Sequence, residues 1–198
     1  AHSLGCDTKW WTDNVPSITS HPCRDRTPAQ AGLGPLDKRG GRWPGIYQAA
    51  ALAKPRLEAR DCAMLGLVCG PLTLASHLAG VRIFTDCYKN PAFAHEVCAF
   101  ASEICAQAAS FYLEMGADIL AVVDPVASQV KAPIFAEFVT PYARPAIEVI
   151  RAADKTSAFF ICGDCAKVLD QVCAIGAHAI AIDEQVNLSH VKALAHEH

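Results

Sequence analysis

The sequence has no long apolar run and no large excess of charge of one sign. None of its apolar stretches reaches the roughly 18 to 20 residues that a membrane-spanning helix needs, so no membrane segment is expected. Its 17 basic and 20 acidic residues give a formal net charge of -3, and the densest basic stretches, residues 24–26 and 37–42, are interrupted by acids or glycines. Because a nucleic-acid surface normally shows a clustered basic excess, these stretches are interpreted as solvated loops, and no nucleic-acid partner is expected.

A recognisable signal peptide, an internal repeat and a low-complexity tract are also missing. Most of the ten cysteines lie inside apolar segments, as small buried side chains do in a reducing compartment. We therefore expect a cytoplasmic protein. The alternative, a secreted scaffold held by disulfides, would be richer in loops and less apolar than a chain with 52% hydrophobic residues.

The chain divides into two parts of different composition. With 198 residues it is long enough to bury a core, and one domain spanning residues 1–198 is expected. Residues 1–45 are rich in Pro, Gly, Ser and Asp, which predicts a loop-rich segment that wraps over another part of the molecule. This segment holds all three tryptophans, Trp10, Trp11 and Trp43. Residues 46–198 show helical patterns alternating with short apolar runs.

Four short apolar runs predict buried strands, over residues 63–69, 118–123, 157–161 and 178–182. Helices are predicted over residues 46–61, 70–78, 91–115, 135–153 and 166–175, and from about residue 189 to the end. Pro55 is expected to interrupt or end the first helix, and Pro141 and Pro145 to kink or break the fourth. Apolar strands that alternate with helices are typical of an α/β fold whose parallel sheet is covered on both faces.

Each predicted strand is followed by residues suited to a functional site: Gly70, Asp124, Cys162, and the pair Asp183 and Glu184. The carboxyl ends of parallel strands meet at one edge of a sheet, where ligands and metals gather in α/β proteins, so these residues are expected to converge. Cys162 and Cys165 lie where a strand gives way to a helix, and the helix N-terminus is expected to lower the thiol pKa. Acids and thiols together suit a catalytic metal with an open position.

Each of these residues also has a structural interpretation. An Asp after a strand is often a helix cap or a turn residue. A lone Cys-x-x-Cys pair is weak evidence for zinc because a closed structural site needs four ligands, and in a chain with ten cysteines the pair is also explained as core filler. The convergence of the residues is better evidence for a site than any one of them.

Five segments resemble a known family: Gly70-Pro-Leu-Thr-Leu-Ala-Ser76, residues 116–128, Phe135-Ala-Glu-Phe-Val-Thr-Pro-Tyr142, Ile161-Cys-Gly-Asp164 and Ile182-Asp-Glu-Gln-Val186. In this order they resemble the uroporphyrinogen decarboxylase superfamily. The Asp-Pro-Val-Ala-Ser and Ile-Asp-Glu-Gln-Val segments are more similar to its corrinoid branch, the methylcobamide:coenzyme M methyltransferases. The family fold is a (β/α)8 TIM barrel of well over 300 residues. With four clear strands, this chain is expected to form an incomplete barrel, and a homo-oligomer or a partner chain to complete it.

For the corrinoid branch, the resemblance implies transfer of a methyl group from a methyl-corrinoid to a thiol or similar small-molecule acceptor. The donor would be a corrinoid protein or free methylcobalamin, and zinc would bind the acceptor as a thiolate. The ligands of that branch are a His-x-Cys pair and a distant Cys. Cys162 matches the first Cys, Phe160 stands where the His belongs, and the distant Cys would lie beyond residue 198. Cys165 is the candidate substitute ligand, at a different spacing.

The candidate catalytic residues are Asp124, Asp183 and Glu184, and the candidate substrate-binding residues are Gly70, Tyr88, Ser128 and Tyr142. One alternative is a uroporphyrinogen decarboxylase of porphyrin metabolism, in which an Asp and a Tyr, matched loosely by Tyr88, hold the substrate. That activity also implies an arginine-rich amino-terminal segment, which is absent here, although a tetrapyrrole with eight carboxylates needs several bidentate arginines. A second alternative is a noncatalytic binding or assembly member of the superfamily.

Overall fold

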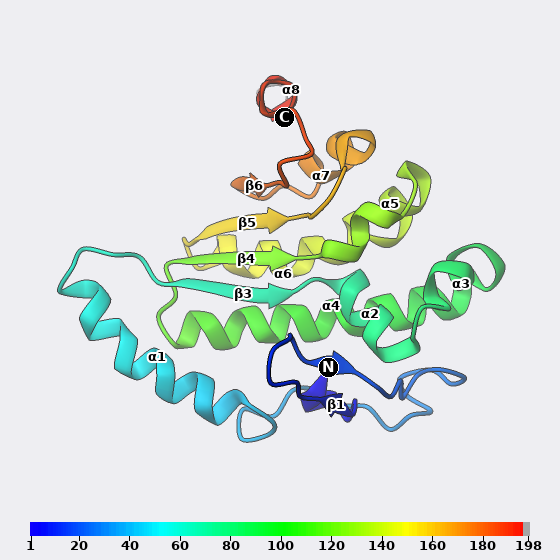
Figure 1. Ribbon diagram of the computed structural model, residues 1–198, viewed down its shortest axis with the longest axis horizontal. Helices are drawn as coiled ribbons and strands as arrows, with labels where there is room; N and C mark the ends of the chain where they lie inside the picture. Colours follow the sequence, from blue (N-terminus) through cyan, green and yellow to red (C-terminus); the bar gives the residue numbers. More distant parts are fainter. Residues whose placement is uncertain (196–198) are drawn as a thin grey trace.

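The computed structural model describes residues 1–195 and shows a four-stranded sheet with helices packed on it (Figure 1). The strands are β1 (Thr8–Lys9), β2 (Ser17–Ile18), β3 (Leu65–Cys69), β4 (Ile119–Val123), β5 (Thr156–Phe160) and β6 (Ala179–Ala181). The α-helices are α1 (Trp43–Glu58), α2 (Pro71–Ala79), α3 (Ile83–Lys89), α4 (Pro91–Glu114), α5 (Ala132–Phe138), α6 (Thr140–Ala152), α7 (Leu169–Cys173) and α8 (Leu188–Ala195). Three short 3-10 helices, η1 (His2–Leu4), η2 (Pro125–Gln129) and η3 (Ala166–Val168), complete the elements.

The main sheet is parallel, as the sequence predicted. Its strand order is β3-β4-β5-β6, and each neighbouring pair is parallel and in register, so that Cys69 pairs with Val123, Val123 with Phe160 and Phe160 with Ala181. Within residues 1–195, β3 and β6 each pair with a single strand and the sheet stays open. The fold is therefore α/β with the strand–helix alternation of a TIM barrel, and the barrel is not closed.

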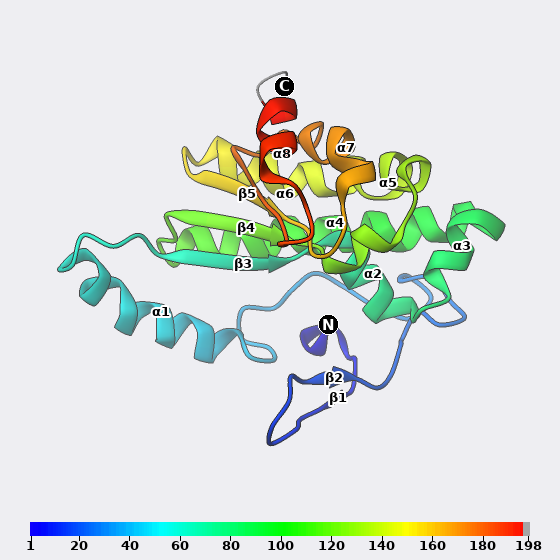
Figure 2. The same cartoon turned by 45° about the horizontal axis from the view of Figure 1, so that its top comes forward.

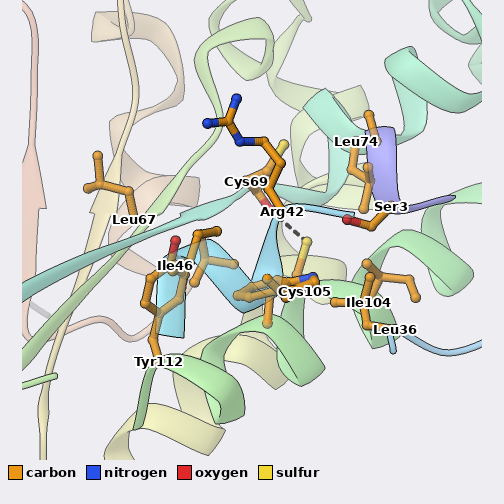
Figure 3. Close-up of a pocket in the computed structure, with 14 residues that line it drawn as sticks. Ser3, Leu36, Arg42, Ile46, Leu67, Cys69, Leu74, Ile104, Cys105 and Tyr112 are labelled. Carbon is orange, nitrogen blue, oxygen red and sulfur yellow. Dashed lines mark hydrogen bonds between the residues drawn. The ribbon is translucent and has the colours of Figure 1, made fainter. Parts of the chain in front are cut away.

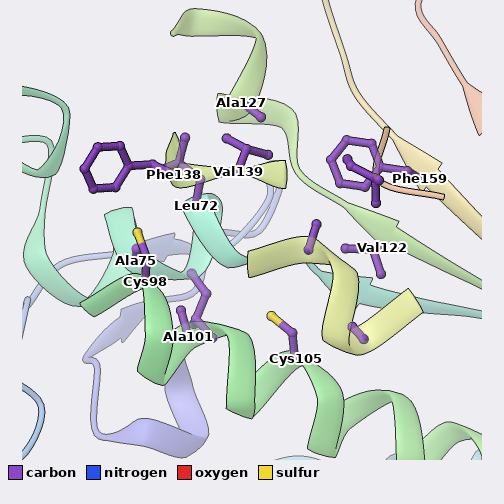
Figure 4. Packing of buried hydrophobic residues seen from close by; sticks show 14 of the residues in the cluster. Leu72, Ala75, Cys98, Ala101, Cys105, Val122, Ala127, Phe138, Val139 and Phe159 are labelled. Carbon is purple, nitrogen blue, oxygen red and sulfur yellow. The ribbon is translucent and has the colours of Figure 1, made fainter. Parts of the chain in front are cut away.

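The two faces of the sheet are covered differently. On one face, Leu120, Val122 and Phe159 are fully buried in a core that also includes α2, α4, α5 and α6 (Figure 4). On the other face, Leu65 and Leu67 of β3 are exposed. The expectation that both faces are covered is therefore wrong for β3. In a barrel that second face lines the interior, so it is covered only when the strands close into a ring.

The cysteines confirm the core-filling interpretation in part. Cys98 and Cys105 lie on α4 and are buried in the core, while Cys62 and Cys69 at the two ends of the first predicted strand are exposed. All ten cysteines lie within the described residues and none forms a disulfide. The alternative of a disulfide scaffold is not supported.

The prolines act only in part as predicted. Pro55 lies inside the last turn of α1, and the helix continues past it to Glu58. The predicted helix over residues 135–153 is broken into α5 and α6 at Val139, with Pro141 in the first turn of α6, whereas Pro145 lies inside α6 without breaking it. The short helix α3 was not predicted. The last predicted helix is α8, and its continuation past residue 195 lies outside the described residues.

The amino-terminal segment forms loops and a small antiparallel hairpin, in which Thr8 pairs with Ile18 and Lys9 with Ser17. Both views place this hairpin beyond β3, on the side of the sheet away from β6 (Figure 2). The segment that follows the hairpin is tied to the end of α2 by a backbone hydrogen bond from Cys23 N to Leu78 O of 2.8 Å. None of the helices in residues 1–195 combines the length and apolar character needed to cross a membrane.

Candidate functional site

The residues that come after the four parallel strands share one edge of the sheet. The hydrogen-bond ladder continues past the strand ends: Gly70 N donates to Val123 O at 2.7 Å, Asp124 N to Phe160 O at 2.9 Å, and Ile161 N to Ala181 O at 3.1 Å. The residues just beyond these bonds include Cys162 and Asp183. The common edge predicted from the parallel order is therefore present.

Asp124 caps a helix at this edge. Its Oδ2 accepts a hydrogen bond from Leu72 N at 2.9 Å, and its Oδ1 accepts from Thr73 N at 2.9 Å and from the Thr73 hydroxyl at 2.6 Å. These donors form the first turn of α2, whose positive end favours a carboxylate. The side chain is completely buried, and this burial raises the pKa of Asp124 against the opposing effect of the three hydrogen bonds.

Gly70 permits this arrangement by having no side chain. A Cβ at position 70 would lie 2.6 Å from Oδ2 of Asp124, which is closer than real Cβ contacts come. Gly70, which was expected to bind substrate, and Asp124, which was expected to be catalytic, form one structural unit. In it, the end of β3, the end of β4 and the start of α2 are packed against one carboxylate.

A second group of residues joins the ends of β4, β5 and β6. Gly163 N donates to Asp183 Oδ2 at 2.8 Å, and a Cβ on Gly163 would lie 3.4 Å from the Ser128 hydroxyl. Gly163 has a φ of +72°, a conformation that favours glycine. Hydrogen bonding by the Glu184 side chain and by the Gly163 backbone lowers the pKa of Asp183. Its other oxygen, Oδ1, is buried and has no hydrogen-bond partner among the described residues.

The two thiols at this edge are less acidic than predicted. Cys162 is half-buried and Cys165 is buried. Burial raises the pKa of both thiols, and the nearby carboxylate of Asp183 raises both further. The expectation that a helix N-terminus lowers these pKa values was wrong. The chain after Cys165 forms only the three-residue η3 and the five-residue α7, so there is no long helix dipole to offset burial and the carboxylate.

The tyrosines expected to bind substrate lie on helices rather than at the strand ends. Tyr88 is exposed on α3. The Tyr142 hydroxyl of α6 lies 2.7 Å from His95 Nδ1 of α4, and His95 Nε2 lies 3.2 Å from Glu137 Oε1 of α5. The His95 ring also stacks on Phe138 at 4.3 Å. Nothing in the sequence signals the pairing of His95 with a tyrosine 47 positions away, so sequence reasoning misses this contact.

The comparisons with known proteins agree with this architecture. The family model described as uroporphyrinogen decarboxylase (URO-D) matches residues 1–198. The chain belongs to the URO-D family. A solved structure described as a methyltransferase from Methanosarcina mazei superposes with a TM-score of 0.84 at 23% identity, covering 98% of this chain and 58% of that one. This likeness confirms the fold.

Curated URO-D family relatives include methyltransferases and decarboxylases. The methylcobamide:CoM methyltransferase MtbA of Methanosarcina acetivorans is 24% identical over 191 residues, which cover 95% of this chain and 56% of the relative. The methylcobamide:CoM methyltransferase MtaA of Methanosarcina barkeri is 24% identical over 188 residues, covering 93% and 54%. The uroporphyrinogen decarboxylase of Thermosynechococcus vestitus is 26% identical over 151 residues, covering 71% and 44%. The chain thus spans about half the length of the curated relatives that it matches.

Zinc, which the resemblance to the corrinoid branch implies, does not fit the residues present. Phe160, at the position expected for a His ligand, is the last residue of β5 and lies in register with Val123 and Ala181, so apolar side chains flank it. Within residues 1–195, no three His, Cys, Asp or Glu side chains are grouped closely enough to hold a metal ion. Cys162 and Cys165 therefore do not form a zinc site with other residues of this part of the chain, and no chemical step is assigned to zinc.

A cavity of about 200 Å³ lies beside the carboxyl end of β3 and was not predicted (Figure 3). Its walls come from four separate parts of the chain, and its lining includes Ser3, Arg42, Leu67, Cys69, Ile104 and Cys105. The Cys105 thiol donates to Cys69 O at 2.7 Å, which links α4 to the last residue of β3. Because the lining residues are far apart in the sequence, no local motif reveals this cavity.

Proposed function

We propose that the protein to which this chain belongs is a corrinoid-dependent methyltransferase, which moves a methyl group from a methyl-corrinoid to a thiol or similar acceptor. A corrinoid protein or free methylcobalamin would be the donor. The observation that carries the proposal is the group formed by Ser128, Cys162, Gly163 and Asp183 at one edge of a parallel sheet. Ser128 and Asp183 lie in the two segments most similar to the corrinoid branch, and the methylcobamide methyltransferases among the relatives align with nearly the whole chain.

Asp183 is proposed to bind and orient the acceptor. Its lowered pKa keeps the carboxylate ionised at neutral pH, and its Oδ1 lacks a donor among the described residues. A buried carboxylate oxygen normally accepts a hydrogen bond, so an acceptor bearing an S–H, N–H or O–H group would supply the missing donor. A group with a lowered pKa is a weak base, so Asp183 holds and aligns the acceptor, and the acceptor's proton passes to solvent when the methyl group is transferred.

The other residues of the edge are proposed to shape the site. The raised pKa of Cys162 keeps it a neutral thiol, which would line the site and can donate a weak hydrogen bond to the acceptor. Glu184 is exposed next to Asp183 and helps to set the pKa of that carboxyl. Asp124 and Gly70 position the ends of β3 and β4 and the start of α2, because all hydrogen bonds of the Asp124 carboxylate lie within the cap.

Decarboxylation of a tetrapyrrole is the second candidate, because two curated relatives are uroporphyrinogen decarboxylases. The edge of the sheet where the strands end is less suited to a tetrapyrrole. In residues 1–195, the hydrogen bonds that arginine side chains donate go to Asp25, Asp37, Asp86 and backbone oxygens, and none goes to a residue of the edge. A substrate with many carboxylates would need several such arginines near the site.

A turnover assay on the full-length protein separates the candidates. The protein is incubated with methylcobalamin and a small thiol, and in parallel with uroporphyrinogen, and products are followed by mass spectrometry. Appearance of the methylated thiol supports the proposal. Decarboxylation of uroporphyrinogen without methyl transfer would overturn it in favour of the second candidate. Turnover of neither substrate set would leave a noncatalytic member of the family as the better description.

A further inference from the structure

The tip of the β1–β2 hairpin exposes large apolar side chains. Trp10 is 52% exposed, Trp11 is 47% exposed and Val15 is 75% exposed. We call these three residues the hairpin tip. It projects from the body of the molecule on the side of β3 (Figure 2). Single exposed apolar residues are ordinary, but two neighbouring tryptophans are not, since Trp is among the residues most enriched where proteins bind one another.

Contacts with charged and polar neighbours hold both rings of the hairpin tip in place. The Arg42 guanidinium lies 4.7 Å from the Trp10 ring centre, and the Lys9 ammonium lies 3.8 Å from that of Trp11. The Trp11 indole N–H also donates to the Ser17 hydroxyl at 3.1 Å. The rings are therefore ordered before any partner binds, which lowers the entropic cost of using them as anchors.

The third tryptophan of the chain is buried, unlike Trp10 and Trp11. Trp43 is only 8% exposed, and its ring packs edge-on against Phe111 with centroids 5.0 Å apart. The chain thus buries one tryptophan of its amino-terminal segment and leaves the other two in solvent, supported by cations.

The charge of this segment differs from that of the rest of the chain. Residues 1–45 contain six basic residues (Lys and Arg) and four acidic residues. Residues 46–198 contain eleven basic and sixteen acidic residues. The acidic residues within the hairpin are Asp7 and Asp13, and the cations at the rings are Lys9 and Arg42. These two acids and two cations balance, but residues 1–45 as a whole carry two more basic than acidic residues on an otherwise acidic chain, and both cations lie at the exposed rings. This placement favours a partner that presents an acidic surface to the rings.

The hairpin tip lies near the β3 end of the edge, and the proposed site follows β4, β5 and β6 along the same edge. Arg42, which supports Trp10, lines the same cavity as Cys69, the last residue of β3 (Figure 3). A protein seated on Trp10 and Arg42 therefore lies next to the edge at which the strands end. We propose that the hairpin tip, with Lys9 and Arg42, is the docking surface for an acidic face of the protein that carries the methyl-corrinoid. This inference rests on the proposed function.

Hydroxyl-radical footprinting of the full-length protein tests the proposal, with Trp43 as an internal control. In the free protein, Trp10 and Trp11 are expected to oxidise several-fold faster than Trp43. Addition of a purified corrinoid-binding protein loaded with methylcobalamin is expected to slow their oxidation several-fold, whereas free methylcobalamin should not. Slow oxidation of Trp10 and Trp11 in the free protein would show that the rest of the chain or a second copy covers them, and would overturn the proposal. Exposure without protection would overturn it as well.

Kinetics of a double variant distinguish this proposal from the proposed function. Trp10→Ala with Trp11→Ala is expected to raise KM for the corrinoid-binding protein at least tenfold and to leave turnover of free methylcobalamin unchanged. Leu52→Ala, which removes an exposed apolar side chain from α1, is the control and should alter neither. An unchanged KM in the double variant would refute the docking proposal and leave the proposed function intact. Absence of methyl transfer from free methylcobalamin by the unaltered protein would refute the proposed function itself.

Discussion

Two carboxylates lie on the same edge of the sheet, one after β4 and one after β6, and their surroundings make them chemically different. Asp124 is fully buried, accepts three hydrogen bonds from one helix turn, and has its pKa raised by burial. Asp183 is half-buried, and its Oδ2 accepts a hydrogen bond from Gly163 N. Its Oδ1 has no partner of good hydrogen-bond geometry among the described residues, and hydrogen bonding, first by Glu184, lowers its pKa. The difference comes from the elements that surround each carboxylate. The nine-residue helix α2 begins beside Asp124, whereas the residues that hydrogen-bond to Asp183, Gly163 and Glu184, lie in loops.

The largest effect is expected when a side chain is added at Gly70, beside the buried carboxylate of Asp124. Gly70→Ala would place a methyl group 2.6 Å from Oδ2 of Asp124, so the carboxylate or the helix must move. We expect a loss on the order of 3 kcal/mol in the free energy of unfolding, as overpacking at a hydrogen-bonded core site produces. Gly163→Ala is the matched variant beside the half-buried Asp183. Its Cβ meets only the Ser128 side chain, with the hydroxyl at 3.4 Å, so the cost is that of the φ of +72°, about 1 to 2 kcal/mol. Urea denaturation of the full-length protein measures both, and equal losses would contradict the distinction.

Removing the charge of Asp124 is the next largest change. Asp124→Asn keeps the shape but turns an N–H₂ group toward one of the donors of α2, so a buried donor loses its partner. We expect a loss of about 2 to 3 kcal/mol in the free energy of unfolding. Thr73→Val removes only the hydroxyl that donates to Asp124 at 2.6 Å, and about 1 to 1.5 kcal/mol is expected. A smaller loss for Asp124→Asn than for Thr73→Val would show that the carboxylate does not hold the cap.

Asp183→Asn is expected to act on turnover more than on stability. The amide cannot accept hydrogen bonds at both positions, so the acceptor is held less well and the rate of methyl transfer should fall about tenfold or more. Asp164→Asn, on the same loop, removes an exposed carboxylate whose Oδ1 accepts only from Ala166 N, and serves as the control. Turnover equal to that of the unaltered protein would remove Asp183 from the proposed site.

The pH dependence of stability gives the same residue a second test. The pKa of Asp183 is lowered in the folded protein, so its contribution to stability is present above the pKa of an unfolded aspartate, about 3.9. That contribution is lost as the pH falls through the folded value. The stability curve of Asp183→Asn should therefore be flatter in this acidic window than that of the unaltered protein, when both are measured by urea denaturation at a series of pH values. Parallel curves would contradict the lowered pKa.

The strands and their shared edge were predictable because each strand is a short apolar run that ends at a Gly, Asp or Cys. The helix α3 was not, because its seven residues, Ile83–Lys89, are too few to show a period of 3.6. The chemistry of the edge was predictable only in part. The sequence places Asp124 and Cys162 at strand ends, but the capped helix turn and the burial that raises the thiol pKa depend on tertiary packing.

The smallest effect is expected outside the edge, at the contact between α4 and α6. Tyr142→Phe removes the hydroxyl 2.7 Å from His95 Nδ1, and we expect a loss of about 1 kcal/mol in the free energy of unfolding, because one net hydrogen bond disappears. Methyl transfer should change less than twofold, since this hydroxyl is already paired between helices. Tyr112→Phe is the control, because the Tyr112 hydroxyl has no hydrogen-bond partner among the described residues, so its stability should not fall. A tenfold fall in turnover for Tyr142→Phe at unchanged stability would instead support the substrate-binding role predicted from the sequence, and would extend the site from the strand ends to the helices around them.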